Sequence, residues 1–215
     1  MITRPILRAG ITILPSTVFA GLVISLSRLS SLRVVVVAVV GVKELLRLVR
    51  EEGLVEGLCE RELTNPEGAG FDIRAGEVYK VGGKAFLGVT ERFTPPHEKL
   101  AGIDAGDKSF SLAPGDFVLV KTMESFNLPA DLTMHAFPRS TLHRSGLWLL
   151  ATQTAPGYKG SLVFGLKNMG DCTVDIELGA RVAHVQFNRV EGGGAAYRGQ
   201  WQGGRVTSEA REKQV

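Results

Sequence analysis

Two arginines and two hydroxyl side chains gather in the segment Pro138-Arg-Ser-Thr-Leu-His-Arg-Ser-Gly146. Ser140 and Arg144 are four residues apart, so they share a face if this segment is helical. Free N–H groups at a helix start, a hydroxyl and two guanidinium groups together form a site suited to phosphate. The plainer alternative is a solvent-exposed helix start with a Ser or Thr cap, which is common in proteins.

A glycine-rich turn follows at Ala155-Pro-Gly-Tyr-Lys-Gly160. Its proline and glycines predict a tight turn or hairpin whose backbone can approach a ligand closely. A turn with an aromatic residue is also often purely structural. The functional interpretation therefore depends on the two segments being taken together.

Together, the two segments resemble the dUTPase and dCTP deaminase superfamily. The first is similar to the family's Arg-Ser-Ser-Leu-x-Arg-x-Gly segment, which binds triphosphate. The second resembles the Asp-x-Gly-Tyr/Trp-x-Gly hairpin, which holds the pyrimidine through main-chain groups. The resemblance implies that substrate-binding residues include Arg139, Ser140, Thr141, Arg144, Ala155, Pro156, Gly157 and Tyr158.

Two departures from the family pattern affect the chemistry. Ala155 stands where dUTPases carry the aspartate that activates water, and a methyl group cannot take a proton. Gly165 occupies the position of the deaminase glutamate that shuttles protons at the pyrimidine C4. The catalytic residues are therefore unknown from the sequence. Asp72, or a carboxylate from a neighbouring subunit, could stand in.

Two further segments resemble family motifs within strands. Gly70-Phe-Asp-Ile-Arg74 is similar to an early Gly-x-Asp-Leu-Arg segment. We interpret it as fold-defining, because residues two apart on a strand share a face and Asp72 and Arg74 can pair with other charges. In Gly179–Phe187, His184 replaces a glutamine that often touches phosphate. A histidine can still donate a hydrogen bond, although a lone histidine on a strand more often serves packing.

The tail segment Tyr197-Arg-Gly-Gln-Trp-Gln-Gly203 resembles the family arm that closes over bound nucleotide. Glycine hinges suit such a lid. The resemblance implies that Tyr197, Gln200 and Gln202 contact substrate, while Ala196 replaces the lysine of the deaminase tail. The alternative is a disordered glycine-rich tail.

The remaining pattern predicts short strands after one amphipathic helix. Leu45, Leu46 and Val49 recur at helical spacing and predict a helix over about 42–53. Residues 127–134 also have strand character, and 88–108 are expected to form an irregular loop or hairpin. The expected strands are 70–79, 116–121, 161–167, 173–178 and 181–187. Such a pattern indicates an all-β barrel or sandwich. The resemblance implies a dUTPase-like jelly roll with one or two short helices, assembled as a homotrimer with sites at subunit interfaces.

Residues 1–41 differ in composition from the rest, since 18–42 are almost wholly apolar. Arg28 and Arg33 argue against a membrane span, because a charge in the bilayer interior is costly. Two other interpretations remain. The segment is an extra strand or helix of the fold, or it is absent from the mature protein because translation starts near Val39 or Val40. We favour the later start. The expected domains are this extension, a β domain at 42–190 and a flexible C-terminal arm at 191–215.

Charge and cysteine content exclude other classes. Residues 1–42 hold four arginines and no acid, and removing them from 25 Lys+Arg leaves 21 against 22 Asp+Glu. A near-neutral body does not indicate nucleic-acid binding. Two distant cysteines form neither a disulfide framework nor a zinc site, and cytoplasm is the default location.

The function that the resemblance implies is dUTP diphosphatase, which yields dUMP and pyrophosphate and uses Mg²⁺ bound with the triphosphate. One alternative is a regulatory nucleotide-binding homologue with little catalysis. The other is dCTP deaminase, although Gly165 and Ala196 both depart from that pattern. The sequence does not decide between uracil and cytosine.

Overall fold

The computed structural model describes residues 39–208 and 210–214 of the chain. The predictions for residues 1–38 lie outside this range. Val39 pairs with Asn188, and the N–H of the buried Val40 donates to the Phe187 carbonyl at 2.8 Å. These two residues therefore pack with the β domain that follows them.

The first helix, α1 (Val42–Glu52), lies where its periodicity predicted it. Leu45 and Leu48 are buried, while Leu46 and Val49 pack partly against the same core. Gly53 adopts the left-handed conformation (φ 64°) that favours glycine after a helix end. The short α2 (Glu60–Thr64) has no counterpart among the predicted elements.

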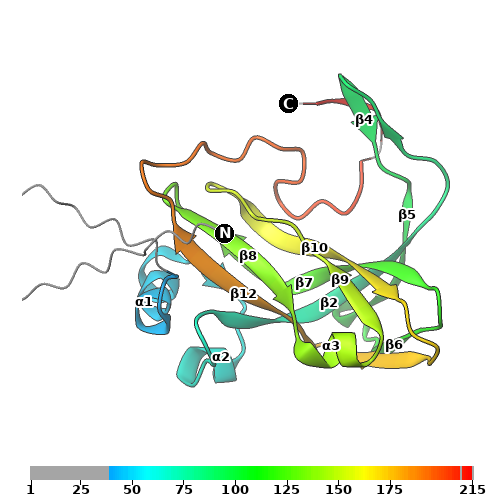
Figure 1. The fold of residues 1–215 in the computed structure, drawn as a ribbon, viewed down its shortest axis with the longest axis horizontal. Helices are drawn as coiled ribbons and strands as arrows, with labels where there is room; N and C mark the ends of the chain where they lie inside the picture. Colours follow the sequence, from blue (N-terminus) through cyan, green and yellow to red (C-terminus); the bar gives the residue numbers. More distant parts are fainter. Residues whose placement is uncertain (1–38, 209, 215) are drawn as a thin grey trace, which may run out of the picture. The chain divides into compact units, whose positions relative to one another are not determined.

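The main sheet is antiparallel and nearly closed into a barrel (Figure 1). Its path runs β8 (Leu132–Pro138), β12 (Arg181–Arg189), β2 (Phe71–Val81), β7 (Phe117–Asn127), β10 (Lys159–Asn168) and β9 (Leu147–Leu150), with β1 (Val55–Glu56) beside β7 and β5 (His97–Gly102) beside β2. The two ends of the path meet because Met134 of β8 exchanges both backbone hydrogen bonds with Thr154. The predicted all-β barrel is confirmed.

Two small sheets extend the barrel. One joins β6 (Ser109–Leu112) to β11 (Val174–Glu177), and the other joins β3 (Phe86–Leu87), β4 (Glu91–Phe93) and β13 (Glu212–Lys213). A 3-10 turn, η2 (Ile103–Ala105), precedes β6. The core between the strands is apolar, and its fully buried members include Phe71, Ile73, Phe126, Leu166 and Phe187.

One sequence expectation needs correction. Residues 127–134 are not one strand, because the chain turns at 128–131 between β7 and β8. Residues 88–108 contain β4 and β5, and β4 pairs with β3 as a hairpin, which agrees with the hairpin alternative for this stretch. Pro95 and Pro96 lie just before β5, where their missing N–H groups do not interrupt its pairing with β2.

Candidate nucleotide site

The segment 138–146, which resembles a phosphate-binding motif, begins at a strand end and continues into a short helix. Arg139 follows β8 in an extended conformation, and its N–H donates to the Val182 carbonyl at 3.0 Å. The helix α3 (Ser140–Arg144) is anchored by the buried Leu142. Ser140, Thr141 and Arg144 remain exposed, and Arg144 reaches back to the Ser140 carbonyl at 3.3 Å. The motif therefore presents a hydroxyl and a guanidinium group to solvent on one helix face.

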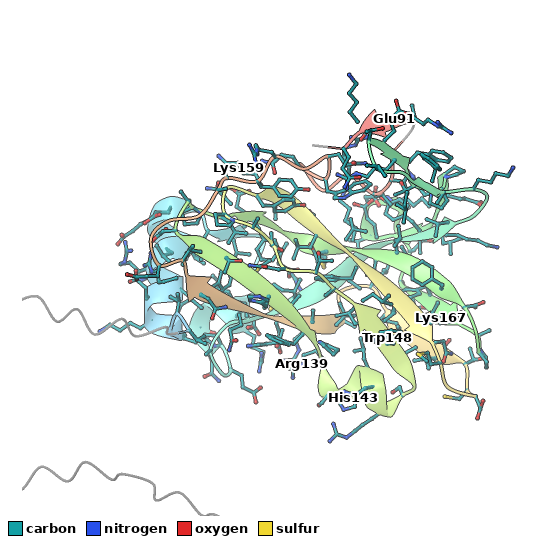
Figure 2. All side chains as sticks on the ribbon, turned by 45° about the horizontal axis from the view of Figure 1, so that its top comes forward. Glu91, Arg139, His143, Trp148, Lys159 and Lys167 are labelled. Atoms are coloured by element: carbon teal, nitrogen blue, oxygen red, sulfur yellow. The ribbon has the colours of Figure 1, made fainter. Side chains whose placement is uncertain are left out.

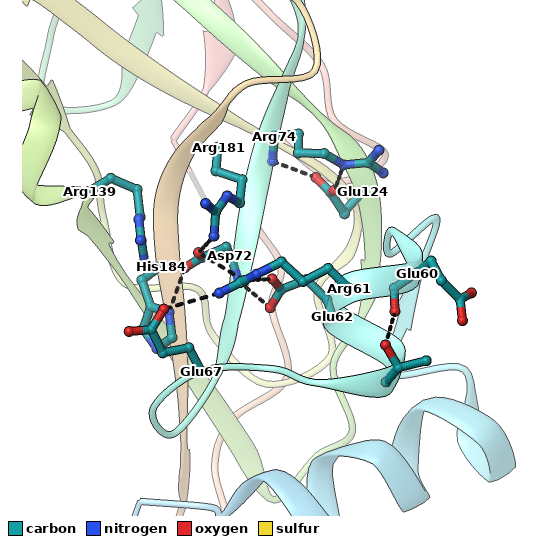
Figure 3. Close-up of polar contacts among 11 residues, drawn as sticks. Glu60, Arg61, Glu62, Glu67, Asp72, Arg74, Glu124, Arg139, Arg181 and His184 are labelled. Atoms are coloured by element: carbon teal, nitrogen blue, oxygen red, sulfur yellow. Dashed lines mark hydrogen bonds and ion pairs between the residues drawn. The ribbon is translucent and has the colours of Figure 1, made fainter.

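The Arg139 side chain turns toward a buried carboxylate, Asp72 of β2 (Figure 3). Asp72 is only 1% exposed, and its Oδ1 accepts from Arg139 at 2.7 Å and lies 2.9 Å from Nδ1 of His184. Its Oδ2 accepts from Arg181 at 2.7 Å and from Arg61 at 3.5 Å. Three arginines and a histidine therefore converge on one carboxylate. We call these five residues the Asp72 cluster.

A second buried acid supports the cluster from α2. Glu62 is fully buried, and its carboxylate accepts from the Asp72 N–H at 3.0 Å and from the Arg61 guanidinium. Arg61 also pairs with Glu67 at 3.1 Å. Arg61 is therefore paired mainly with Glu62 and Glu67. Within the described residues, Asp72 is the carboxylate that Arg139 and Arg181 share.

Arg74, two residues after Asp72, pairs with a different acid. Its Nε donates to the fully buried Glu124 at 2.7 Å, and its N–H donates to the same carboxylate at 3.0 Å. Burial raises the pKa of Glu124, and the bonds from Arg74 act in the opposite direction. The expectation that Asp72 and Arg74 each pair with other charges is confirmed.

The hairpin at 155–160 is held by the C-terminal arm of the same chain. The buried Tyr158 meets Tyr197 edge-on, with ring centroids 5.3 Å apart, and the Tyr197 N–H donates to the Pro156 carbonyl at 2.7 Å. Gly160 has φ 123°, and a Cβ there would lie 2.6 Å from the carbonyl carbon of Gly203. Glycine at 160 therefore lets the arm lie directly against the hairpin.

The two glutamines of the arm bind protein groups. Gln202 spans the hairpin backbone, donating to the Gly157 carbonyl and accepting from the Lys159 N–H, each at 3.2 Å. Gln200 accepts from Arg92 of β4. The arm is thus folded onto its own hairpin.

A cavity of about 470 Å³ lies between the barrel and this arm. Tyr158, Tyr197 and Trp201 line one part of it, and Phe117 and Leu119 of β7 line another. Its polar lining comes from Thr94, Thr152, Gln153, Thr154, Arg205 and Thr207, with no carboxylate. The cavity therefore combines aromatic and apolar walls with several hydrogen-bonding groups and one arginine, a lining typical of a small-molecule site.

The hairpin and the segment 138–146 lie at opposite ends of β10 (Figure 2). Lys159 begins this strand, whereas its last residue, Asn168, pairs with Leu147, just beyond α3. Ten residues of strand span about 30 Å. One nucleotide therefore cannot reach both groups of residues within a single copy of the chain.

The two departures from the family pattern have different surroundings. Ala155 is half-buried, and its carbonyl accepts from the Tyr158 N–H at 3.3 Å. Gly165 of β10 pairs with Leu119 and Leu150, and a Cβ there would lie 3.0 Å from Cε2 of Phe117. The ring of Phe117 thus lies next to the space that a side chain at 165 would enter.

The predicted site residues form two groups. His184 and Arg139 meet at Asp72, while Pro156, Gly157, Tyr158, Tyr197 and Gln202 meet at the hairpin. The contributions of Arg61 and Arg181 to the Asp72 cluster, and of Trp201 to the cavity, were missed. Asp72 and His184 are direct partners across β2 and β12. The alternating pattern of each strand predicts the strand itself, but neither pattern determines which residues of the two strands face each other.

Within residues 39–208 and 210–214, no group of three or more His, Cys, Asp or Glu side chains is arranged to hold a metal ion. No helix in the described part has both the length and the apolar character required to cross a membrane.

Comparison with known proteins identifies relatives with two activities. A family model described as dCTP deaminase-like matches residues 39–190. A dCTP deaminase of Thermococcus kodakarensis is 30% identical over 167 residues, 77% of this chain and 95% of the relative. A probable deoxyuridine 5'-triphosphate nucleotidohydrolase of Methanothermobacter thermautotrophicus is 34% identical over 144 residues, 66% of this chain and 89% of the relative.

Among solved structures, the 2'-deoxycytidine 5'-triphosphate deaminase of Agrobacterium tumefaciens matches with a TM-score of 0.56 and 17% identity. The match covers 71% of this chain and 49% of that one. At this identity it supports the fold alone. The predicted family resemblance is confirmed by the relatives.

Proposed function

The chain belongs to the dCTP deaminase-like family, whose members include dCTP deaminases and dUTPases, and from this membership we propose that it is a dUTP diphosphatase. The reaction is the hydrolysis of dUTP to dUMP and pyrophosphate, with Mg²⁺ entering as part of the Mg·dUTP substrate. A pyrimidine nucleotide as substrate accounts for both the anion-binding motif and the aromatic-lined cavity.

The observation that carries the choice between the two family activities is the pair Gly165 and Phe117. Deamination at C4 needs a proton shuttle beside the pyrimidine. By the resemblance, that shuttle is a glutamate at position 165, where this chain has no side chain and the Phe117 ring lies 3.0 Å from an added Cβ. Hydrolysis at phosphorus does not require this group. The relatives are mostly named dCTP deaminase, and one is named a probable deoxyuridine 5'-triphosphate nucleotidohydrolase, so their names do not favour hydrolysis over deamination.

We propose that a complete site forms between copies of the chain, as in a homotrimer. The separation of about 30 Å along β10 favours this arrangement, because Arg139, Ser140 and Arg144 would bind the phosphates of a nucleotide whose base enters the neighbouring copy's hairpin. Phe137, Trp148 and Leu150 flank α3 as exposed apolar side chains, which suits contact with a second copy.

Within such a site each group has a defined role. Arg144 and Ser140 provide a charge-assisted bond and a hydroxyl to phosphate oxygens, and Arg139, whose guanidinium also donates to Asp72, adds positive charge beside them. Main-chain groups of the hairpin read the pyrimidine edge, and the arm excludes water once it closes. Mg²⁺ neutralises charge on the triphosphate when it is bound.

A nucleotide-binding homologue with little turnover is the second candidate, and Ala155 favours it because the usual base is missing. One experiment separates the three functions. The pure protein is incubated with Mg²⁺ and either dUTP or dCTP, and the nucleotides are resolved by chromatography. Formation of dUMP from dUTP alone supports the diphosphatase. Binding without product supports the regulatory homologue, and dUTP or dUMP from dCTP supports the deaminase.

A further inference from the structure

We propose that His184, held by Asp72, is the general base that activates water for the hydrolysis of dUTP, in place of the carboxylate missing at Ala155. This inference rests on the proposed diphosphatase function. It also gives a reason for the histidine at a position where the resemblance implies glutamine.

The two side chains are fixed by sheet register. Asp72 of β2 and His184 of β12 are direct partners across antiparallel strands, and Nδ1 lies 2.9 Å from Oδ1. Because Asp72 is a carboxylate among arginines and offers acceptors only, Nδ1 carries the hydrogen of this bond. In the neutral ring, the other nitrogen, Nε2, then holds the lone pair that accepts a proton.

Nε2 is left open for such a role. It has no hydrogen-bond partner within the described residues, and it is not among their buried unsatisfied atoms. The His184 side chain is 22% exposed, whereas Asp72 is 1% exposed. Gly68 and Gly70 lie against Nε2, and a Cβ would be 3.7 Å from it at Gly68 and 2.9 Å at Gly70. Backbone without side chains therefore borders the free nitrogen.

The imidazole also adjoins the phosphate-binding motif. Arg139 and His184 bind the same oxygen of Asp72, so the ring is one carboxylate oxygen away from the first arginine of that motif. Arg181 holds the other oxygen at 2.7 Å and prevents the carboxylate from rotating freely. A base with a fixed tautomer and a fixed orientation meets the positional requirement of water activation.

The reaction balances without any further reactant. A water oxygen attacks the α-phosphorus of dUTP while its proton passes to Nε2 of His184. The bond from the α-phosphorus to the oxygen that bridges to the β-phosphate breaks, and pyrophosphate leaves with that bonding electron pair. dUMP is released, and the proton on Nε2 passes to solvent, which restores the neutral imidazole.

Several charged groups surround the imidazole. Asp72 faces it from β2, Arg181 from β12 and Arg139 from the end of β8, while Arg61 and Glu62 of α2 and Glu67 of the following loop complete the network.

The test compares His184→Gln and His184→Ala with the unaltered protein and with the matched control His135→Gln. His135 of β8 contacts Asn188 of β12 and lies outside the proposed machinery. We expect kcat to fall about 100-fold or more in both His184 variants, with affinity for α,β-imido-dUTP unchanged. Added imidazole should restore part of the turnover of His184→Ala, and His135→Gln should behave as the unaltered protein.

Unchanged kcat in His184→Gln and His184→Ala would overturn the base assignment while leaving the diphosphatase function intact. Loss of analogue affinity with kcat preserved would also overturn it, because His184 would then be a phosphate contact. No turnover of dUTP by the unaltered protein would overturn the proposed function, and this inference with it.

Discussion

The ring of Phe117 lies over Gly165, with Cε2 3.0 Å from the position of a Cβ at that residue. Leu150 closes the other side, with its Cβ at 3.3 Å. Phe117 of β7 and Leu150 of β9 thus flank the space that a side chain at 165 would enter. This packing relationship underlies our preference for hydrolysis over deamination.

The change Gly165→Glu should therefore destabilise the protein. Overpacking of a filled site costs about 1–3 kcal/mol, and the same change in a Phe117→Ala background should cost much less. Urea unfolding of the two single variants and the double variant gives the coupling between the positions. Equal costs in the two backgrounds would show that Phe117 does not restrict position 165.

Replacing Arg144 by alanine should weaken nucleotide binding. The Arg144 guanidinium is exposed on α3 and bonded within the described residues only to the Ser140 carbonyl, so it is available to phosphate. Losing a charged hydrogen-bond partner costs about 1.5–3 kcal/mol. Calorimetry with α,β-imido-dUTP measures this loss, and Arg50→Ala on α1 is the exposed control. Unchanged affinity in Arg144→Ala would remove the phosphate assignment.

Gly160→Ala should detach the arm from its hairpin. Gly160 has a positive φ of 123°, which disfavours any side chain. The new methyl group would also lie 2.6 Å from the carbonyl carbon of Gly203. Amide hydrogen exchange in residues 197–207 should accelerate. Gly82→Ala, with no atom within 4 Å of its Cβ, is the matched control. Protection that survives in Gly160→Ala would mean that the arm is held by other contacts.

Stability should fall at alkaline pH through Tyr158. Burial, assisted by the neighbouring Tyr197, raises the pKa of Tyr158 from 10.0 to about 12. The folded state therefore keeps the phenol neutral where the unfolded chain ionises it. The resulting stability is complete below pH 10.0 and is lost as the pH rises to about 12.

The variant Tyr158→Phe isolates this contribution. It also loses the hydrogen bond from the phenol to the Ser161 carbonyl, so its stability at neutral pH should be lower. Its free energy of unfolding in urea should decline less steeply with pH over the alkaline range than that of the unaltered protein. Parallel curves for the two proteins would contradict the assigned pKa shift.

The sequence predicted those elements whose periodicity is local. The amphipathic pattern around Leu45 predicted α1, and alternating segments predicted β2 and β12. Asn127–Met134 was misread because strand-like residues continue across the turn between β7 and β8. Composition alone does not mark that turn, although Pro129 lies within it.

The site was less predictable than the fold because it depends on long-range register. Asp72 and His184 are 112 residues apart, and only the pairing of β2 with β12 makes them partners. Family motifs identified Arg139 and Tyr158 separately. No local pattern indicated that Arg139 would pair with Asp72 or that Gln202 would span the hairpin backbone.

The most direct test of the diphosphatase proposal is the position of solvent oxygen in the products. The pure protein is incubated with Mg·dUTP in ¹⁸O-labelled water, and the products are separated and analysed by mass spectrometry. Attack of water on the α-phosphorus predicts one labelled oxygen in dUMP and none in pyrophosphate. Label in pyrophosphate, or no dUMP at all, would contradict the proposal that this chain hydrolyses dUTP between its α- and β-phosphates.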